Sequence, residues 1–229
     1  MHIPAYLDGG DAGRAETRCM LCQRTEPPFE RAVAYGSYDG GLRDLIHLLK
    51  FQQVRPAAAV LGRMLAETIG DLDEAMTAGT ITVVPVPLHA RKQAQRGFNQ
   101  AEMIARSALQ QLSCPERFEL SIGVLVRRRE TGSQIGLTRH QRRENLRGAF
   151  AVSGATQIVN RDILLIDDVY TTGTTASECA RVLRRAGAVR VWVATVARTL
   201  KISDAIVLPE ADDPPEEGNE DRVGLAAHG

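Results

Sequence analysis

The chain has 229 residues, of which 44% are hydrophobic and 24% charged, and its formal net charge is zero. This length allows one large domain with appendages, and the apolar fraction is sufficient for a sizeable core. A net charge of zero excludes a uniformly basic protein that binds nucleic acid or membranes through its bulk charge. The charge is nevertheless uneven: residues 127–147 carry seven arginines against two acids, and residues 203–229 carry eight acids against one arginine.

Neither a membrane span nor an export signal is predicted. No apolar stretch approaches the ~18 residues that a transmembrane helix needs. Residues 1–16 lack a charged segment followed by an apolar one. The four cysteines, Cys19, Cys22, Cys114 and Cys179, are too sparse for a disulfide framework. We therefore expect a cytoplasmic protein in a reducing compartment, without membrane insertion; the sequence predicts no oligomeric state.

Strands and helices are predicted to alternate along the chain. Apolar or alternating runs predict strands at residues 31–40 (with a turn), 80–89, 123–129, 162–168 and 188–197. Apolar residues at helical spacing predict helices at residues 42–51, 57–69, 98–112 and 174–187, and residues 130–147 are predicted to be polar loop or the start of a helix. This order is typical of an α/β protein with a parallel sheet flanked by helices. Composition divides the chain into a flexible leader at residues 1–30, the α/β domain at 31–200 and a disordered acidic tail at 201–229.

Two adjacent acids and a threonine-rich loop follow the apolar run that starts at residue 162. In open parallel sheets ligands bind at the carboxyl ends of strands, which makes Asp167 and Asp168 candidate site residues. The loop that follows them leads into a helix, whose free N–H groups and partial positive charge suit a phosphate. Since carboxylates repel phosphate, we expect the acids to face a sugar instead. The alternative is an ordinary turn between strand and helix, capped by Asp and Thr.

The stretch ILLIDDVYTTGTT, residues 163–175, resembles the signature with which type I phosphoribosyltransferases bind phosphoribosyl pyrophosphate (PRPP). The resemblance implies that Asp167 and Asp168 contact the 2′- and 3′-hydroxyls of the ribose and belong to the catalytic residues. It also implies that PRPP binds together with Mg²⁺. The residues that would hold the 5′-phosphate are Thr171, Thr172, Gly173, Thr174 and Thr175.

Three further segments narrow the resemblance to the ComF/GntX group of phosphoribosyltransferase-like proteins. They are YDGGLRDLIHLLKF at residues 38–51, VPVPLHARKQAQRGFNQAEMIA at 84–105 and SQIGLTRHQRRENLRGAF at 133–150. Their order and spacing match that group over roughly residues 19–198. The resemblance implies a type I phosphoribosyltransferase-like fold, and one branch of the group is named for competence and DNA uptake.

The resemblance places a pyrophosphate loop after the strand that begins at residue 80. Its residues would be Pro87, Leu88, His89, Arg91 and Arg96, with Lys92 adding positive charge. The alternative is that these basic residues form a solvated face before the next helix. Lys50 is open to two interpretations as well, because a cation at the end of a helix is favoured by the helix dipole whether or not it binds a ligand.

The basic segment 127–147 takes the place of the flexible hood loop of these enzymes. Arginine and glutamine side chains there would close over pyrophosphate and stabilise the charge of the leaving group. The candidates are Arg129 and Gln134 as catalytic residues, with Arg139, Arg143 and Asn145 beside them. A basic patch that contacts single-stranded DNA is the alternative, although the segment contains no aromatic residue on which bases could stack.

A short CxxC pair, Cys19 and Cys22, precedes the matching region. Members of the ComF group carry an N-terminal zinc module with several such pairs, so the resemblance implies a remnant of that module. A structural zinc ion needs four ligands, and this pair supplies two. Cys179 is predicted to be a core residue of the main domain, so the zinc ligand set is incomplete.

Two functions are therefore expected from the sequence. In the first, the chain binds PRPP or ribose 5-phosphate and, if active, transfers the phosphoribosyl group to an acceptor that the sequence does not identify. In the second, the same fold serves as a non-catalytic accessory protein of DNA uptake that binds single-stranded DNA or proteins of the competence machinery.

Overall fold

A computed structural model of the chain describes residues 26–73, 75–76, 79–130 and 139–199. Residues 1–25 of the predicted leader, which include Cys19 and Cys22, the predicted tail and Gln134 lie outside the described residues. The last five residues of the predicted leader are described, and among them Phe29 is buried in a hydrophobic core. In chain order the elements are β1 (Ala32–Ser37), α2 (Gly40–Gln52), α3 (Ala57–Asp73), β2 (Ile81–Pro85), α4 (Ala90–Arg96), α5 (Gln100–Leu109), η1 (Pro115–Arg117), β3 (Phe118–Leu120), β4 (Leu125–Arg127), α6 (Arg139–Leu146), β5 (Phe150–Val152), η2 (Ala155–Gln157), β6 (Asp162–Tyr170), α7 (Thr174–Arg185) and β7 (Arg190–Arg198).

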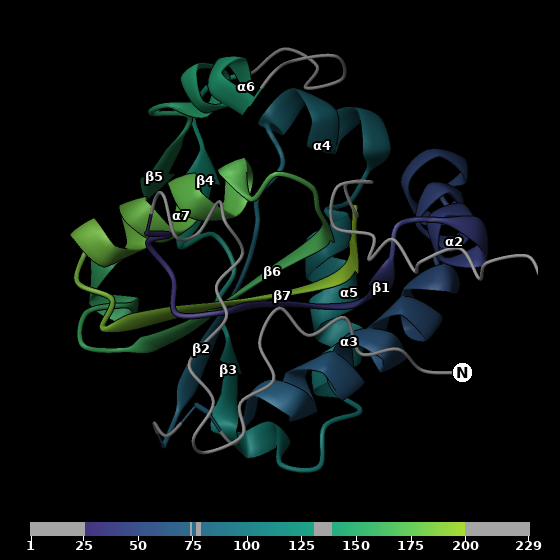
Figure 1. The fold of residues 1–229 in the computed structure, drawn as a ribbon, viewed down its shortest axis with the longest axis horizontal. Helices are drawn as coiled ribbons and strands as arrows, with labels where there is room; N and C mark the ends of the chain where they lie inside the picture. Colours follow the sequence, from purple (N-terminus) through teal and green to yellow (C-terminus); the bar gives the residue numbers. More distant parts are fainter. Residues whose placement is uncertain (1–25, 74, 77–78, 131–138, 200–229) are drawn as a thin grey trace, which may run out of the picture.

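A five-stranded sheet with the order β1-β7-β6-β2-β3 forms the centre of the domain (Figure 1). Every pair of neighbouring strands in it is parallel. Helices α3 and α5 cover one face, and α7 covers the other together with a two-stranded antiparallel sheet of β4 and β5. The predicted parallel sheet flanked by helices is therefore confirmed.

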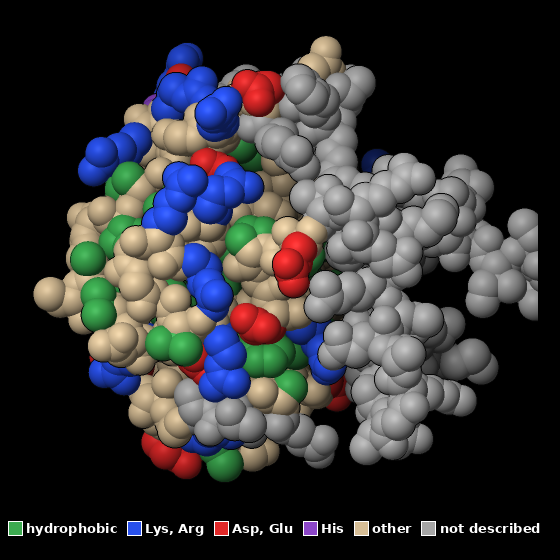
Figure 2. All heavy atoms as spheres, turned by 60° about the vertical axis from the view of Figure 1, so that its left-hand side comes forward, with side chains coloured by type: hydrophobic (Ala, Val, Ile, Leu, Met, Phe, Trp, Pro, Cys, Tyr) green, Lys and Arg blue, Asp and Glu red, His purple; other side chains and the backbone are tan. Residues whose placement is uncertain are grey.

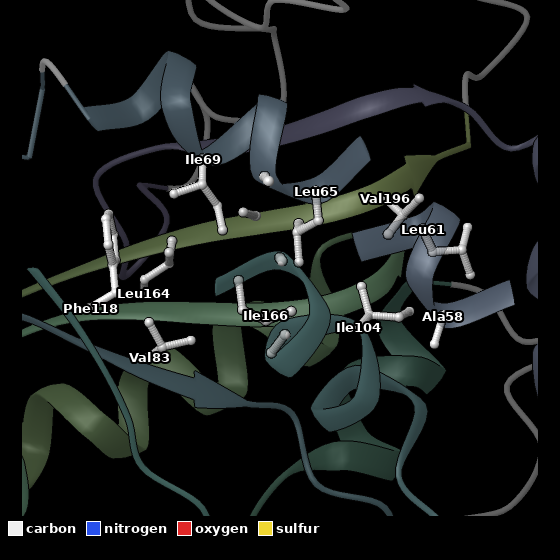
Figure 3. Close-up of a cluster of buried hydrophobic side chains, with 14 of the residues drawn as sticks. Ala58, Leu61, Leu65, Ile69, Val83, Ile104, Phe118, Leu164, Ile166 and Val196 are labelled. Carbon is white, nitrogen blue, oxygen red and sulfur yellow. The ribbon is translucent and has the colours of Figure 1, made fainter. Parts of the chain in front are cut away.

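Two hydrophobic cores lie on the two faces of the sheet. The α3–α5 core is built on side chains such as Leu61, Leu65, Ile104, Leu164 and Ile166 (Figure 3). The α7 core contains Ile163, Leu165, Cys179, Leu183 and Val193. Successive residues of a strand point to opposite faces, which is why the run of apolar residues in β6 serves both cores. Cys179 is buried, as predicted.

Several predicted boundaries differ from the observed ones. The expected strand 80–89 ends at Pro85, because Pro87 has no N–H with which to continue a ladder. The loop expected after it contains the short helix α4, and the helix expected at 98–112 ends at Leu109. Strands β3 and β5 were not predicted, since three-residue strands leave almost no periodic signal. Within the part of the chain that the structure describes, none of the helices combines the length and apolarity that crossing a membrane requires.

Helices α3 and α5 approach closely at Gly62. A Cβ atom added there would lie 2.4 Å from Oγ of Ser107 and 3.0 Å from the backbone nitrogen of Ala108. We expect Gly62→Ala to lower the free energy of unfolding by about 1–3 kcal/mol, because the overpacking outweighs the better helix propensity of alanine.

Gly70 provides the control in the same helix, because a Cβ atom there meets nothing within 4 Å. Gly70→Ala should raise the free energy of unfolding by about 0.5–1 kcal/mol. Urea unfolding of both variants measures the difference. Equal changes in the free energy of unfolding for the two variants would show that α3 and α5 move apart at Gly62 without a loss of stability.

Candidate functional site

The connections of β2 and β6 create a switch point at the carboxyl edge of the sheet. After β2 the chain continues through α4 and α5 to β3, and after β6 it continues through α7 to β7, on the opposite side. The strands remain joined there, since the backbone N–H of Val86 donates to the carbonyl of Ile166 at 2.8 Å. Such a switch point is where ligands bind in open parallel sheets.

The two acids follow Ile166 directly but face opposite sides of the sheet. Leu164 and Ile166 point into the α3–α5 core, so alternation directs Asp168 to that side and Asp167 to the side of α7. Strand β6 continues to Tyr170, so the two acids lie within the strand and not beyond its end. The adjacent acids in the sequence are thus two separate groups with different neighbours.

Asp168 forms an ion pair with Lys50. Oδ2 of Asp168 lies 2.5 Å from Nζ of Lys50, and the two side chains are only 6% and 18% exposed. Burial by itself would lower the pKa of Lys50, but the attraction of Asp168 and Asp167 outweighs it and the net pKa is raised. Lys50 therefore remains charged beside Asp168.

Asp167 is held in a different environment. Its Oδ1 atom accepts a hydrogen bond from the backbone N–H of Asp168 at 2.9 Å. Burial, and next the negative charge of Asp168, raise the pKa of Asp167 to about 8 against the opposing attraction of Lys50. On the α7 side Asp167 interacts electrostatically with Cys179 and Arg127. At neutral pH a large fraction of Asp167 is protonated in the free protein.

The threonine-rich loop after β6 turns into α7 at Gly173. This glycine is the N-cap of α7, with a φ of 69°, and it has no side chain with which to cap the helix. The hydroxyls of Thr172 and Thr174 are 2.8 Å apart. Since the first N–H groups of a helix have no intrahelical partner, the loop combines backbone and hydroxyl donors at one place. The role of this loop in binding a phosphate stays a prediction.

Gly173 tests how tightly this loop is built. A Cβ atom there would lie 2.2 Å from the hydroxyl oxygen of Tyr170. Gly148 has nearly the same φ, 68°, but its Cβ would meet nothing within 4 Å. We expect Gly148→Ala to cost about 1–2 kcal/mol for the left-handed backbone alone. Gly173→Ala should cost about 1–3 kcal/mol more, because the ring of Tyr170 must move.

Denaturant unfolding of the two alanine variants gives both values. The variants share the backbone penalty, so their difference reports the contact with Tyr170. Equal losses of stability would mean that the loop accommodates a side chain.

The predicted pyrophosphate residues extend from the end of β2 into α4. His89 is the N-cap of α4, where its Nδ1 atom accepts a weak hydrogen bond from the N–H of Arg91 at 3.4 Å. Arg91 is exposed and lies 3.5 Å from a carboxylate oxygen of Glu130. Arg96 is half-buried in the last turn of α4. Burial lowers the pKa of its guanidinium, while the attraction of Asp168 opposes that shift. Arg96 is therefore a member of this set that interacts electrostatically with Asp168.

The predicted hood residues are distributed differently. Arg129 is exposed, and its guanidinium donates to the carbonyl oxygens of Asn145 and Arg147 at 2.9 and 3.0 Å. These hydrogen bonds connect the segment after β4 to the C-terminal end of α6. The side chains of Arg139 and Arg143 lie outside the described structure. Figure 2 shows lysine and arginine side chains in separate groups over the side of the molecule that carries α7, not in one continuous patch.

Arg127 and Phe51 are residues that the sequence reasoning missed. Arg127 shares one face of β4 with buried Leu125 and interacts electrostatically with Asp167, a placement that alternation within LVR could have indicated. Phe51 follows Lys50 in α2 and is 67% exposed. Its ring lies 5.1 Å from that of His47 and 5.7 Å from the guanidinium carbon of Arg96. The feature of the sequence that could have indicated this group is a phenylalanine at the last position of the predicted helix 42–51.

Known proteins similar to this chain were found by structure and by sequence. Among solved structures, hypoxanthine-guanine phosphoribosyltransferase from Schistosoma mansoni has a TM-score of 0.35 and 14% identity, covering 63% of this chain and 55% of its own. PRPP amidotransferase from B. subtilis has a TM-score of 0.36 and 20% identity, covering 62% and 26%. No family model matches the chain.

The sequence relatives cover most of the chain. DNA utilization protein YhgH of Escherichia coli (strain K12) is 34% identical over 195 residues, which span 84% of this chain and 82% of the relative. Competence protein F of Haemophilus influenzae is 31% identical, covering 79% and 78%. Competence protein ComFC of Streptococcus pneumoniae is 30% identical, covering 80% and 76%. The resemblance seen in the sequence is thereby confirmed, and the chain belongs to the ComF family of competence and DNA utilization proteins.

Proposed function

We propose that the chain binds PRPP at the switch point between β2 and β6. The observation that supports this most is the order of groups along β6: a buried strand brings Asp167 and Asp168 to its carboxyl end, and the next residues enter the N-terminus of α7, whose N-cap is a glycine. An ionised carboxylate such as that of Asp168 only accepts hydrogen bonds, and a protonated carboxyl such as that of Asp167 both donates and accepts them, so both suit the hydroxyls of a ribose. The N–H groups of the first helical turn suit its 5′-phosphate.

The pyrophosphate of the ligand would extend toward α4. The connection from β2 to α4 starts at the same edge, because Pro85 is paired with Ile166 in the register of the two strands. Arg96 reaches this edge from the far end of α4, and its guanidinium has the planar donor geometry that phosphate groups favour. Arg127 supplies a second cation on the side of Asp167.

Mg²⁺ fits this site together with the ligand, not by itself. The described residues hold no group of three or more His, Cys, Asp or Glu side chains that could bind a metal ion. One oxygen of Asp168 is already in contact with Lys50. Mg²⁺ commonly binds through one or two carboxylates and the phosphates of a substrate. We therefore expect the pyrophosphate to bring Mg²⁺, which would neutralise charge on the leaving group.

The same arrangement suits transfer of the phosphoribosyl group. The bond between ribose C1 and pyrophosphate would break as an acceptor atom bonds to C1, and the acceptor would lose a proton. The carboxylate of Asp168 would stabilise the positive charge that develops on the ribose, and Arg96 the negative charge on pyrophosphate. The acceptor is not identified by any of these groups.

Calorimetric titration with PRPP and Mg²⁺ tests this function. The natural protein should bind, and the Asp167→Asn/Asp168→Asn variant should lose at least about tenfold in affinity, because the acceptors for the ribose hydroxyls are weakened. Asp44→Asn, an exposed acid on α2, is the matched control. Absence of binding by the natural protein would refute the proposal. A screen of nucleobases and amines with PRPP, with pyrophosphate release as the readout, then tests transfer.

A second candidate function, binding of single-stranded DNA, is favoured by the group around Phe51. The exposed ring of Phe51 is flanked by His47 and by the cation of Arg96. Exposed aromatic rings beside cations are typical of surfaces on which unpaired bases stack. The relatives named above are DNA utilization and competence proteins, which agrees with this candidate.

Affinity for a single-stranded oligonucleotide, measured over a range of salt concentrations, tests the second candidate. Phe51→Ala should weaken binding by about 1–3 kcal/mol without changing the salt slope, because stacking is lost and no charge is removed. Replacing Arg128, Arg142 and Arg143 should reduce the slope. Val60→Ala, 45% exposed on α3, serves as the control. An affinity for the oligonucleotide that changes neither with salt concentration nor in Phe51→Ala would exclude this function.

A further inference from the structure

Lys50 is an unusual neighbour for a ligand-binding carboxylate because most of its side chain is removed from solvent. It lies in the last turn of α2, and only 18% of its side chain is exposed. Lysine side chains are rarely buried, since removing an ammonium group from water costs several kcal/mol unless a partner compensates. The compensating partner is Asp168, at 2.5 Å. The fold thus brings a cation to this acid from a distant segment of the chain.

The ion pair leaves Asp168 with limited capacity for another cation. Its Oδ2 atom is fully buried and is the atom that Lys50 contacts. A metal ion that approached this oxygen would have to displace Lys50. The remaining oxygen, Oδ1, still has the lone pairs to accept hydrogen bonds from hydroxyl groups. The geometry therefore favours a sugar over a metal ion as the direct ligand of Asp168.

Arg96 adds to the positive charge around this acid. It interacts electrostatically with Asp168, and its guanidinium donates to Oε1 of Gln100 at 2.5 Å, which holds it on α4 next to α5. Two cations from two different helices thus act on one carboxylate. A second negative group, such as the phosphate of a sugar phosphate, can approach without first being neutralised by a metal ion.

We propose that Lys50 takes the place of a divalent cation beside Asp168, so that the site binds ribose 5-phosphate without Mg²⁺. This inference rests on the proposed PRPP site and defines its metal requirement. Mg²⁺ then enters with the pyrophosphate of PRPP, where the ligand itself carries additional charge. The half of the ligand that contacts β6 and the α7 loop is bound by protein groups alone.

Calorimetry with ribose 5-phosphate in EDTA and in Mg²⁺ tests the natural protein directly. The dissociation constants in the two buffers should agree within about twofold, because the metal ion makes no contact that the ligand needs. Binding of ribose 5-phosphate only in the presence of Mg²⁺ would overturn the inference. This comparison needs no variant, so it stands whatever the substitutions below do to folding.

The Lys50→Met variant tests the residue itself. In EDTA it should bind ribose 5-phosphate at least about tenfold more weakly than the natural protein, and addition of Mg²⁺ should restore part of the loss. Rescue by a metal ion distinguishes a charge role from a merely structural one. Lys50→Arg should retain binding in EDTA, and Arg43→Met, an exposed cation of the same helix, should leave it unchanged. A Lys50→Met variant that binds equally well in EDTA would overturn the inference.

The outcomes separate this inference from the proposed function. If the natural protein binds neither ribose 5-phosphate nor PRPP with Mg²⁺, the proposed function fails and the inference fails with it. If PRPP binds with Mg²⁺ while ribose 5-phosphate requires the metal ion, only the role of Lys50 is refuted.

Discussion

Asp168→Ala should lower the free energy of unfolding by about 3–5 kcal/mol, because it leaves the buried ammonium group of Lys50 without its partner. This is a large part of the ~5–15 kcal/mol that stabilises a typical domain. The deficit should shrink as the pH is raised toward 10. Without the attraction of Asp168, burial lowers the pKa of Lys50 in the folded variant. The unfolded variant then binds more protons than the folded one as the pH approaches 10, so the free energy of unfolding of the variant rises with pH.

The double variant Asp168→Leu/Lys50→Met is the control for this prediction. Replacing both members of a buried ion pair by apolar groups of similar size is often neutral or stabilising. The double variant should therefore recover most of the stability lost by Asp168→Ala, as measured by denaturant unfolding. A double variant as unstable as Asp168→Ala would show that Asp168 stabilises the fold through contacts other than Lys50.

Asp167→Asn should remove a loss of stability that the natural protein suffers between about pH 5 and pH 8. The pKa of Asp167 is about 8 in the folded protein, compared with about 3.9 in an unfolded chain. Between these values the native state binds one more proton than the unfolded state, so stability falls as the pH rises, by up to about 1.4 kcal/mol per pH unit. Asparagine cannot ionise, and the difference between the two proteins should level off above pH 8.

Unfolding curves at several pH values, with Asp44→Asn as an exposed control, measure this effect. The stability of Asp167→Asn relative to the natural protein should grow steadily from pH 5 to pH 8. Asp44→Asn should follow the natural protein throughout. Parallel curves for the natural protein and Asp167→Asn would contradict the assigned environment of Asp167.

The local elements of this fold could be predicted where a long pattern marks them. Strands β2, β6 and β7 contain long apolar runs. Helix α5 begins at Gln100 after the N-cap Asn99, whose side chain accepts a hydrogen bond from the N–H of Ala101. The short strands β3, β4 and β5 were missed or overextended. They owe their existence to neighbouring strands, and a three-residue segment carries too little periodicity to indicate a strand alone.

The candidate site divides in a similar way between local and distant information. The acids of β6 and the glycine at the start of α7 are close in sequence, so the strand, the loop and the helix N-terminus could be predicted together from residues 163–175. Their neighbours could be predicted only in part: the resemblance named Arg96, Lys50 was left open, and Arg127 was missed. These cations come from three other elements, and their distances from the acids depend on how α2, α4 and β4 pack around the sheet.

The sequence by itself determined the order of strands and helices and the ligand chemistry of one loop, because these depend on contacts between residues near one another in the chain. Only the tertiary structure decided that Asp167 and Asp168 face opposite sides of the sheet and have different environments. The alternation of side chains along β6 separates the two carboxylates. Helix α2 brings Lys50 to Asp168, whereas strand β4 brings Arg127 and helix α7 brings Cys179 to the side of Asp167. Two adjacent aspartates therefore differ: Asp168 forms an ion pair with Lys50, and Asp167 is largely protonated at neutral pH. The difference arises because the burial and the partners of each side chain depend on how the fold packs.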